Sequence, residues 1–316
     1  MITMDTEEHV EQATPAETLQ LQYAPMRVSF TWWGTRKALT DDQKEEAATN
    51  FDTDKGYLSA SKKLIDTKHP AYKPLAKIKR EITAYWKTCS LPFPEPGIRL
   101  LPQSKMEEFE AWMVNAHDRL KQAAWELQDS YAALRDKART DLGRLFNSDD
   151  YPLRVDDLFD VAHNVESVTP PDWLLELKPQ WYEREMQRVR GLFNNAVELA
   201  EQAFIKEMTD LVTNLRDRLS DNADGTPKMF GDGCVEKLKA FIERFKELSV
   251  KSNDDLEKLV GECDSLTHGV TADHFRGLPE LRQHVASKLA EVQAAMEPHI
   301  QALPRRKIVR RPASHE

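Results

Sequence analysis

A stripe of apolar residues between Pro102 and Phe146 constrains the fold most. Its members recur every three or four residues: Met106, Phe109, Met113, Ala116, Leu120, Ala123, Leu127, Tyr131, Leu134, Ala138, Leu142 and Leu145. At 3.6 residues per turn these side chains share one side of a helix, while most positions between them are charged or polar. Such a helix would be roughly 60 Å long, more than a small compact domain needs. We therefore predict an extended helix that buries its stripe against a partner.

A second stripe of similar length begins near Trp181. Its apolar positions are Met186, Val189, Phe193, Ala196, Ala200, Phe204, Met208, Leu211, Leu215 and Leu219. The residues between the two stripes are rich in turn signals, and we interpret 155–165 and 169–177 as short helices. Two matched stripes joined in this way predict a long antiparallel helical hairpin or coiled coil over 103–220, with an elaborated tip at 147–178.

The residues before the first stripe predict a small α+β head at 25–102. Alternating apolar and polar residues predict strands at 26–33 and 98–101, which we expect to pair with each other. Thr40 before a run of acidic residues predicts the start of a helix at 41–50, and a second helix is expected at 71–88. Together with the hairpin, this head makes the predicted fold class mainly α.

The last third of the chain predicts further helices and a basic end. Residues 221–303 are expected to form helices that pack on the base of the hairpin, at 233–248, 253–266 and 278–302. Residues 304–316 are expected to be a disordered basic tail with five cations: Arg305, Arg306, Lys307, Arg310 and Arg311. At the other end, residues 1–24 carry five acidic and no Lys or Arg side chains, which predicts a disordered acidic tail.

Composition restricts the class of protein. The chain has 316 residues, 31% of them charged, and a formal net charge of −9, which does not favour general nucleic-acid binding. No apolar run approaches the ~18 residues of a membrane span, and the first residues lack the pattern of a secretory signal. Three widely spaced cysteines give no disulfide framework. We expect a cytoplasmic protein, in the host cytoplasm if the gene is viral.

No catalytic signature is present. Cys263, His268 and His274 lie within twelve residues of each other, but their spacing fits no standard zinc site, and we favour a buried thiol with loop histidines. No glycine-rich phosphate loop occurs. The sequence therefore predicts a protein that is not an enzyme, with no catalytic residues, no metal and no cofactor.

Aromatic and basic residues gather in the predicted head. They are Trp32, Trp33, Arg36, Lys37, Lys62 and Lys63. Aromatic rings can stack on bases while cations hold phosphates, which would make this group a nucleic-acid surface. Alternatively, the aromatic rings belong to the core of the head and the cations surround it. We take these residues, together with the basic tail, as the first candidate interaction surface.

Three short strings resemble an uncharacterised helical family of bacteria and phages. They are Trp33, Gly34, Arg36, Lys37 and Leu39; then Ser61, Lys62, Lys63, Leu64, Ile65 and Asp66; then Gly97, Ile98 and Arg99. The likeness covers roughly the first 140 residues and departs at Leu101-Pro102, where the family tends to be rich in glycine. It implies a mobile-element setting, a neighbouring gene for a MoxR-type AAA ATPase, and no catalytic residues.

The leading functional prediction is a non-enzymatic helical interaction or scaffold protein that acts through a protein partner. The resemblance alone implies that this partner is a AAA ATPase. The alternative is a nucleic-acid-binding accessory protein that uses the head and the basic tail. No membrane partner is expected, and the sequence leaves the oligomeric state open.

Overall fold

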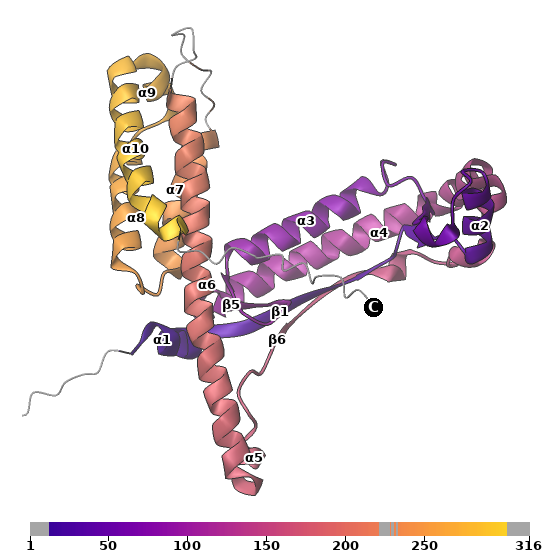
Figure 1. Cartoon of the computed structure of the whole chain (residues 1–316), viewed down its shortest axis with the longest axis horizontal. Coiled ribbons are helices and arrows are strands. Elements are labelled where there is room, and N and C mark those ends of the chain that lie inside the picture. The colour runs from indigo at the N-terminus through magenta and orange to yellow at the C-terminus, as the bar shows by residue number, and fades with distance from the viewer. Residues whose placement is uncertain (1–12, 221–227, 229–230, 232, 302–316) are drawn as a thin grey trace, which may run out of the picture. The chain divides into compact units, whose positions relative to one another are not determined.

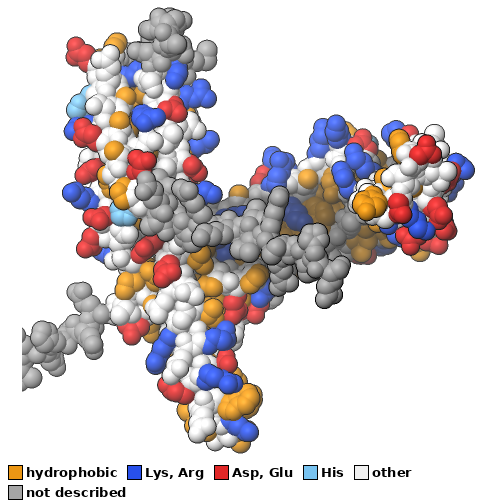
Figure 2. All heavy atoms as spheres, in the orientation of Figure 1, with side chains coloured by type: hydrophobic (Ala, Val, Ile, Leu, Met, Phe, Trp, Pro, Cys, Tyr) orange, Lys and Arg blue, Asp and Glu red, His pale blue; other side chains and the backbone are white. Residues whose placement is uncertain are grey.

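The computed structural model describes residues 13–220, 228, 231 and 233–301. This part of the chain is mainly helical and contains a small amount of antiparallel sheet (Figure 1). The predicted class, mainly α with a minor β component, is therefore confirmed. Figure 2 shows Lys, Arg, Asp and Glu side chains over the exposed faces of the helices, as the charged positions between the apolar stripes require.

The chain divides into two compact units. We call the first the helical unit; it comprises the described residues of Met1–Tyr23, Leu91–Pro96 and Ser167–Glu316. We call the second the α+β unit; it comprises Ala24–Ser90 and Gly97–Glu166. These units do not coincide with the predicted head and hairpin, because the first long helix belongs to the α+β unit and the second to the helical unit.

Strand β1 (Tyr23–Trp32) lies between β5 (Ile98–Pro102) and β6 (Phe159–Val165). Strands β1 and β6 are antiparallel, with Met26 opposite Val165 and Trp32 opposite Phe159. The predicted pairing of the two N-terminal strands is confirmed, because β5 and β1 are hydrogen-bonded neighbours.

Two helices complete the core of the α+β unit. Helix α3 (Lys73–Thr88) packs on α4 (Met106–Leu142), and α4 packs on β6. Leu75, Ile78 and Ile82 of α3 join the core. Most of the α4 stripe is buried there, and Met106 and Leu142 at its ends are partly buried; the buried members are Phe109, Met113, Ala116, Leu120, Ala123, Leu127, Tyr131, Leu134 and Ala138. Burying a stripe of this size removes enough apolar surface to dominate the stability of the unit, at about 25 cal/mol per Å².

A two-stranded sheet lies at one end of the same unit. Strands β2 (Arg36–Ala38) and β3 (Ser61–Lys63) are antiparallel, and α2 (Asp41–Thr49) lies between them in the sequence. The Thr40 hydroxyl accepts a hydrogen bond from the Gln43 backbone N–H, and the Gln43 side chain accepts one from the Thr40 N–H. This reciprocal capping confirms the predicted start of the helix. Short 3₁₀ helices occupy Lys55–Tyr57, Gln103–Lys105, Gly143–Leu145, Ser148–Asp150 and Asp156–Leu158.

The helical unit is built on α6 (Pro179–Leu219), which has 41 residues. Its buried side chains include Val189, Phe193, Ala196, Ala200, Phe204, Met208, Val212, Leu215 and Leu219. These are covered by helices of the same unit and by β4 (Leu91–Pro92). The helices that pack on α6 are α1 (Pro15–Gln22), α5 (Asp172–Leu177), α7 (Gly233–Leu248) and α10 (Pro279–Gln301); α8 (Asp254–Thr267) and α9 (Ala272–Gly277) pack on α10. The predicted C-terminal helices are thus confirmed.

The predicted hairpin of the two long helices is not confirmed. Helix α4 buries its stripe against α3 and the sheet, whereas α6 buries its own against α10, α7 and α1. An apolar stripe specifies that a helix face must be covered, but it does not specify which element covers it. Matched length was therefore insufficient to pair these two helices.

Two local predictions were wrong. The segment 155–165, predicted as a helix, contains a 3₁₀ turn followed by β6. Phe159 and Val161, two residues apart, are both buried in the core, as one side of a strand requires, and β6 pairs with β1. The disorder predicted for 1–24 fails for Pro15–Gln22, which forms α1; residues 1–12 lie outside the described part. Thr14 and Glu17 form a capping box at the start of α1, and Leu19 is fully buried.

Candidate interaction surfaces

The two head tryptophans pack against the core of the α+β unit. Trp32 is half-buried; its indole N–H donates to the Tyr72 hydroxyl at 3.2 Å, and its ring meets Phe159 edge to face at 4.9 Å. Trp33, also half-buried, meets Tyr131 edge to face at 5.9 Å. The ammonium of Lys79 lies 4.3 Å from the centre of the Trp32 ring. Both rings therefore contact the protein's own side chains, and this arrangement argues against a role in stacking on nucleic-acid bases.

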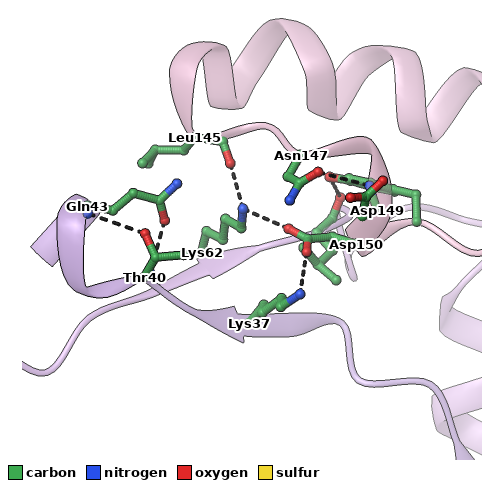
Figure 3. Close-up of polar contacts among 10 residues, drawn as sticks. Lys37, Thr40, Gln43, Lys62, Leu145, Asn147, Asp149 and Asp150 are labelled. Carbon is green, nitrogen blue, oxygen red and sulfur yellow. Dashed lines mark hydrogen bonds and ion pairs between the residues drawn. The ribbon is translucent and has the colours of Figure 1, made fainter.

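Two of the four head lysines and arginines form ion pairs with Asp150 (Figure 3). Lys37 Nζ lies 2.5 Å from one carboxylate oxygen of Asp150, and Lys62 Nζ lies 2.7 Å from the other. Lys62 also donates to the Leu145 carbonyl at 2.6 Å. The side chains of Asp150 and Lys62 are 1% and 4% exposed, so this pair is buried. The Lys37 side chain is 56% exposed and reaches this pair from the surface. We call Lys62 and Asp150, together with Lys37 at their edge, the buried ion cluster; it joins β2 and β3 to the segment after α4.

Local structure positions the carboxylate of this cluster. Asn147 accepts a hydrogen bond from the backbone N–H of Asp149 at 3.0 Å and so begins the 3₁₀ helix that ends at Asp150 (Figure 3). The next residue, Tyr151, donates to the Leu64 carbonyl at 2.8 Å. No local sequence pattern predicts this arrangement, because Asp150 is far from both lysines along the chain.

The titration of Asp150 makes the cluster sensitive to acid. Burial alone would raise the pKa of Asp150, but the hydrogen bonds and charges of Lys37 and Lys62 hold that pKa below its usual value. The stability contributed by ionised Asp150 is therefore fully present above about pH 4, the ordinary pKa of aspartate, and is lost as the pH falls through the lower folded pKa. We expect the free energy of unfolding of the α+β unit, measured by urea titration, to fall over this acidic range. The Asp150→Asn variant should lack this component; identical pH profiles for the two proteins would contradict it.

The other two head cations remain exposed. Arg36 lies on β2, and Lys63 on β3 lines a cavity of about 350 Å³. The floor of the cavity is apolar, with Leu64, Ile65, Leu134 and Ala138, and its rim carries Lys63, Asp66, Lys137 and Asp141. Lys137 and Asp141 pair with each other at 2.8 Å. The rim thus has charges of both signs, and no basic groove for a phosphate backbone results.

The remaining sequence candidates do not converge on a site in the described residues. Cys263 is fully buried, and burial raises the pKa of its thiol to about 12. His268 and His274 are exposed, and His274 accepts the Thr271 N–H at the start of α9. Within 13–220, 228, 231 and 233–301, no three His, Cys, Asp or Glu side chains gather closely enough to hold a metal ion. The basic-tail residues Arg305, Arg306, Lys307, Arg310 and Arg311 lie outside the described part.

A different surface exposes large apolar side chains. Trp173, Leu175 and Leu177 of α5 are 58%, 48% and 71% exposed, and Trp181, in the first turn of α6, is 54% exposed. We call these four residues the apolar tip. Figure 2 shows apolar side chains at this end of α6, among Lys and Arg side chains. Isolated exposed apolar residues are normal on proteins, but here two tryptophans and two leucines are exposed within nine residues, and such a concentration is typical of a binding surface.

The chain builds this tip by interrupting and then restarting a helix. Pro171 precedes α5, and Pro179 begins α6 at a position where a missing N–H costs nothing. Helix α5 packs on α6. No side chain of α6 is buried before Val189, so the first two turns project beyond the core that the other helices of the unit form. The guanidinium of Arg184 lies 4.6 Å from the centre of the Trp181 ring.

Three comparisons with known proteins were made. No protein-family model, no curated protein and no solved structure matches the chain. The resemblance to the phage-associated helical family thus stays a prediction. In the described part of the chain, no helix combines the length and the apolar character needed to cross a membrane.

Proposed function

We propose that this protein works by binding another protein through the apolar tip. The observation that supports the proposal is the exposure of Trp173, Leu175, Leu177 and Trp181 on one short helix and the first turn of another. Tryptophans lose the most water-exposed apolar surface on binding and dominate the energetics of protein interfaces. On this account the protein is a non-enzymatic helical interaction or scaffold protein, as its sequence predicts.

Only the family resemblance suggests which class of protein the partner belongs to. It favours a phage or other mobile element as the source and a AAA ATPase as one candidate partner. The nucleic-acid alternative has less support, because Trp32 and Trp33 pack on the core and Lys37 and Lys62 pair with Asp150. What remains for that alternative in the described residues is Arg36 and Lys63.

Substituting both tip tryptophans should strongly weaken capture of the partner without unfolding the protein. We expect the Trp173→Ser, Trp181→Ser variant to weaken partner binding at least tenfold, since one interface tryptophan commonly contributes 2 kcal/mol or more. The measurement is affinity capture from cells of the source organism, followed by titration of the recovered partner. Substitution is preferable to deleting 147–178, because that deletion would remove β6 from the sheet.

Trp125 provides the matched control. It is 55% exposed on α4 and is not part of the tip. The Trp125→Ser variant should bind like the wild type, and all three proteins should have the same helical circular dichroism signal. Equal partner recovery by the tip variant and the wild type would refute the proposed function.

A further inference from the structure

Five charged side chains lie close to the apolar tip in the sequence. Lys178 and Arg184 supply two cations, and Asp172, Glu176 and Glu183 supply three acids. In the part of the chain that the structure describes, no ion pair joins any of these five to another residue. By contrast, the neighbouring Arg188 is held by Glu185 at 2.7 Å and by Glu95 at 3.2 Å. The tip therefore combines exposed apolar groups with charges of both signs that form no ion pair in the described residues, although the Arg184 guanidinium lies over the Trp181 ring.

A surface of this kind is complementary to itself. In a two-fold symmetric contact, residue i of one copy meets residue j of the other, and j meets i. Lys178 and Arg184 of one copy can then face Asp172, Glu176 and Glu183 of its partner, while the tryptophans and leucines meet at the centre. The sum of these five charges is −1, so repulsion between two tips is small despite the net charge of −9 on the chain.

The exposed apolar area of the tip is large enough for a reversible dimer but small for a permanent one. The four tip side chains, at about half exposure or more, offer on the order of 400 Å² of apolar surface per copy, because an aromatic side chain can bury ~150–250 Å². A standard interface takes about 800 Å² from each partner, so the charged rim would supply the rest. Such an interface is typical of reversible association.

We infer that the apolar tip binds the tip of a second copy of this chain, giving a two-fold symmetric dimer. This inference rests on the proposed function, because it requires the tip to be a protein-binding surface. It adds the identity of the partner and the symmetry of the contact.

Sedimentation equilibrium of the full chain tests the inference. We expect a concentration-dependent increase from the 36.4 kDa monomer to twice that mass. The Trp173→Ser, Trp181→Ser variant should raise the dimer dissociation constant at least tenfold, and Trp125→Ser should leave it unchanged. A monomer at all concentrations, or a dimer that the tip substitutions do not weaken, would overturn the inference. The two proposals can fail separately. If the full chain stayed monomeric, but the wild type captured a different protein that the tip variant did not capture, the dimer would be rejected and the proposed function supported.

Charge exchange between two variants tests the symmetry. The first variant is Lys178→Glu, Arg184→Glu, and the second is Glu176→Lys, Glu183→Lys. Each alone should dimerise more weakly than the wild type, because like charges would then meet across the two-fold axis. Mixing the two should restore association between unlike chains. Failure of the mixture to associate, with both variants folded, would overturn the symmetric contact.

Discussion

Replacing Asp150 with asparagine should lower the free energy of unfolding of the α+β unit by about 3 kcal/mol, because it leaves Lys62 buried without a counterion. The side chain of Lys62 is 4% exposed, so its ammonium group has almost no contact with water. Asparagine keeps the size of aspartate and can still accept a hydrogen bond, so the loss isolates the charge. Urea denaturation, followed by circular dichroism, measures the change.

Two further variants assign this loss to the buried ion cluster. Adding Lys62→Met to Asp150→Asn should recover much of the stability, because the stranded charge is then removed. Asp149→Asn should cost less than about 0.5 kcal/mol, since Asp149 is exposed. If Asp150→Asn and Asp149→Asn had equally small effects, Asp150 would contribute no more than a surface acid.

Replacing Arg282 with methionine should destabilise the helical unit by about 3 kcal/mol, because it removes hydrogen bonds from several buried and part-buried carbonyls at once. Arg282 is 7% exposed. Its Nε donates to the Leu219 carbonyl at 2.7 Å, and its Nη2 donates to the carbonyls of Arg218 and Ser220, at the end of α6, and of Lys228. The guanidinium thus supplies donors and positive charge where the carbonyls of a helix end lack partners.

The control for this prediction lies on the same helix end. Arg218 is exposed, and Arg218→Met should change the free energy of unfolding by at most about 1 kcal/mol, the usual size of a charge–dipole contribution at a surface. Arg282→Lys should have an intermediate effect, because lysine keeps the charge but cannot reach as many carbonyls. Thermal and urea unfolding of the three variants would show whether α10 stabilises α6 through this side chain.

Periodicity predicted most helices of this protein because each amphipathic helix carries its own pattern. The helix at 233–248 was predicted with the bounds that the structure gives to α7, and its apolar side chains Val235, Leu238 and Phe241 are buried. The helix predicted for 155–165 was wrong because apolar residues at 155, 158, 159 and 162 fit either a turn of helix or the start of a strand. Only the pairing partner, β1, decides between them.

Packing between distant segments could not be predicted from the stripes. The α4 and α6 patterns have similar length and spacing, yet each is buried by elements of its own unit. The candidate site shows the same limit. Leu177 and Trp181 have apolar character in the sequence, but their exposure depends on where the core of the helical unit ends along α6. The partnership of Lys62 with Asp150 likewise depends on the tertiary fold.

Site-specific photo-crosslinking in cells of the source organism would test the central claim most directly. A photoreactive phenylalanine analogue at position 177, the most exposed of the four tip residues, should form a covalent adduct with a protein, whether a second copy of this chain or another partner. The same analogue at position 125, on an exposed face of α4, should form none. Absence of an adduct at 177, or equal adducts at both positions, would contradict the claim that this protein acts through its apolar tip.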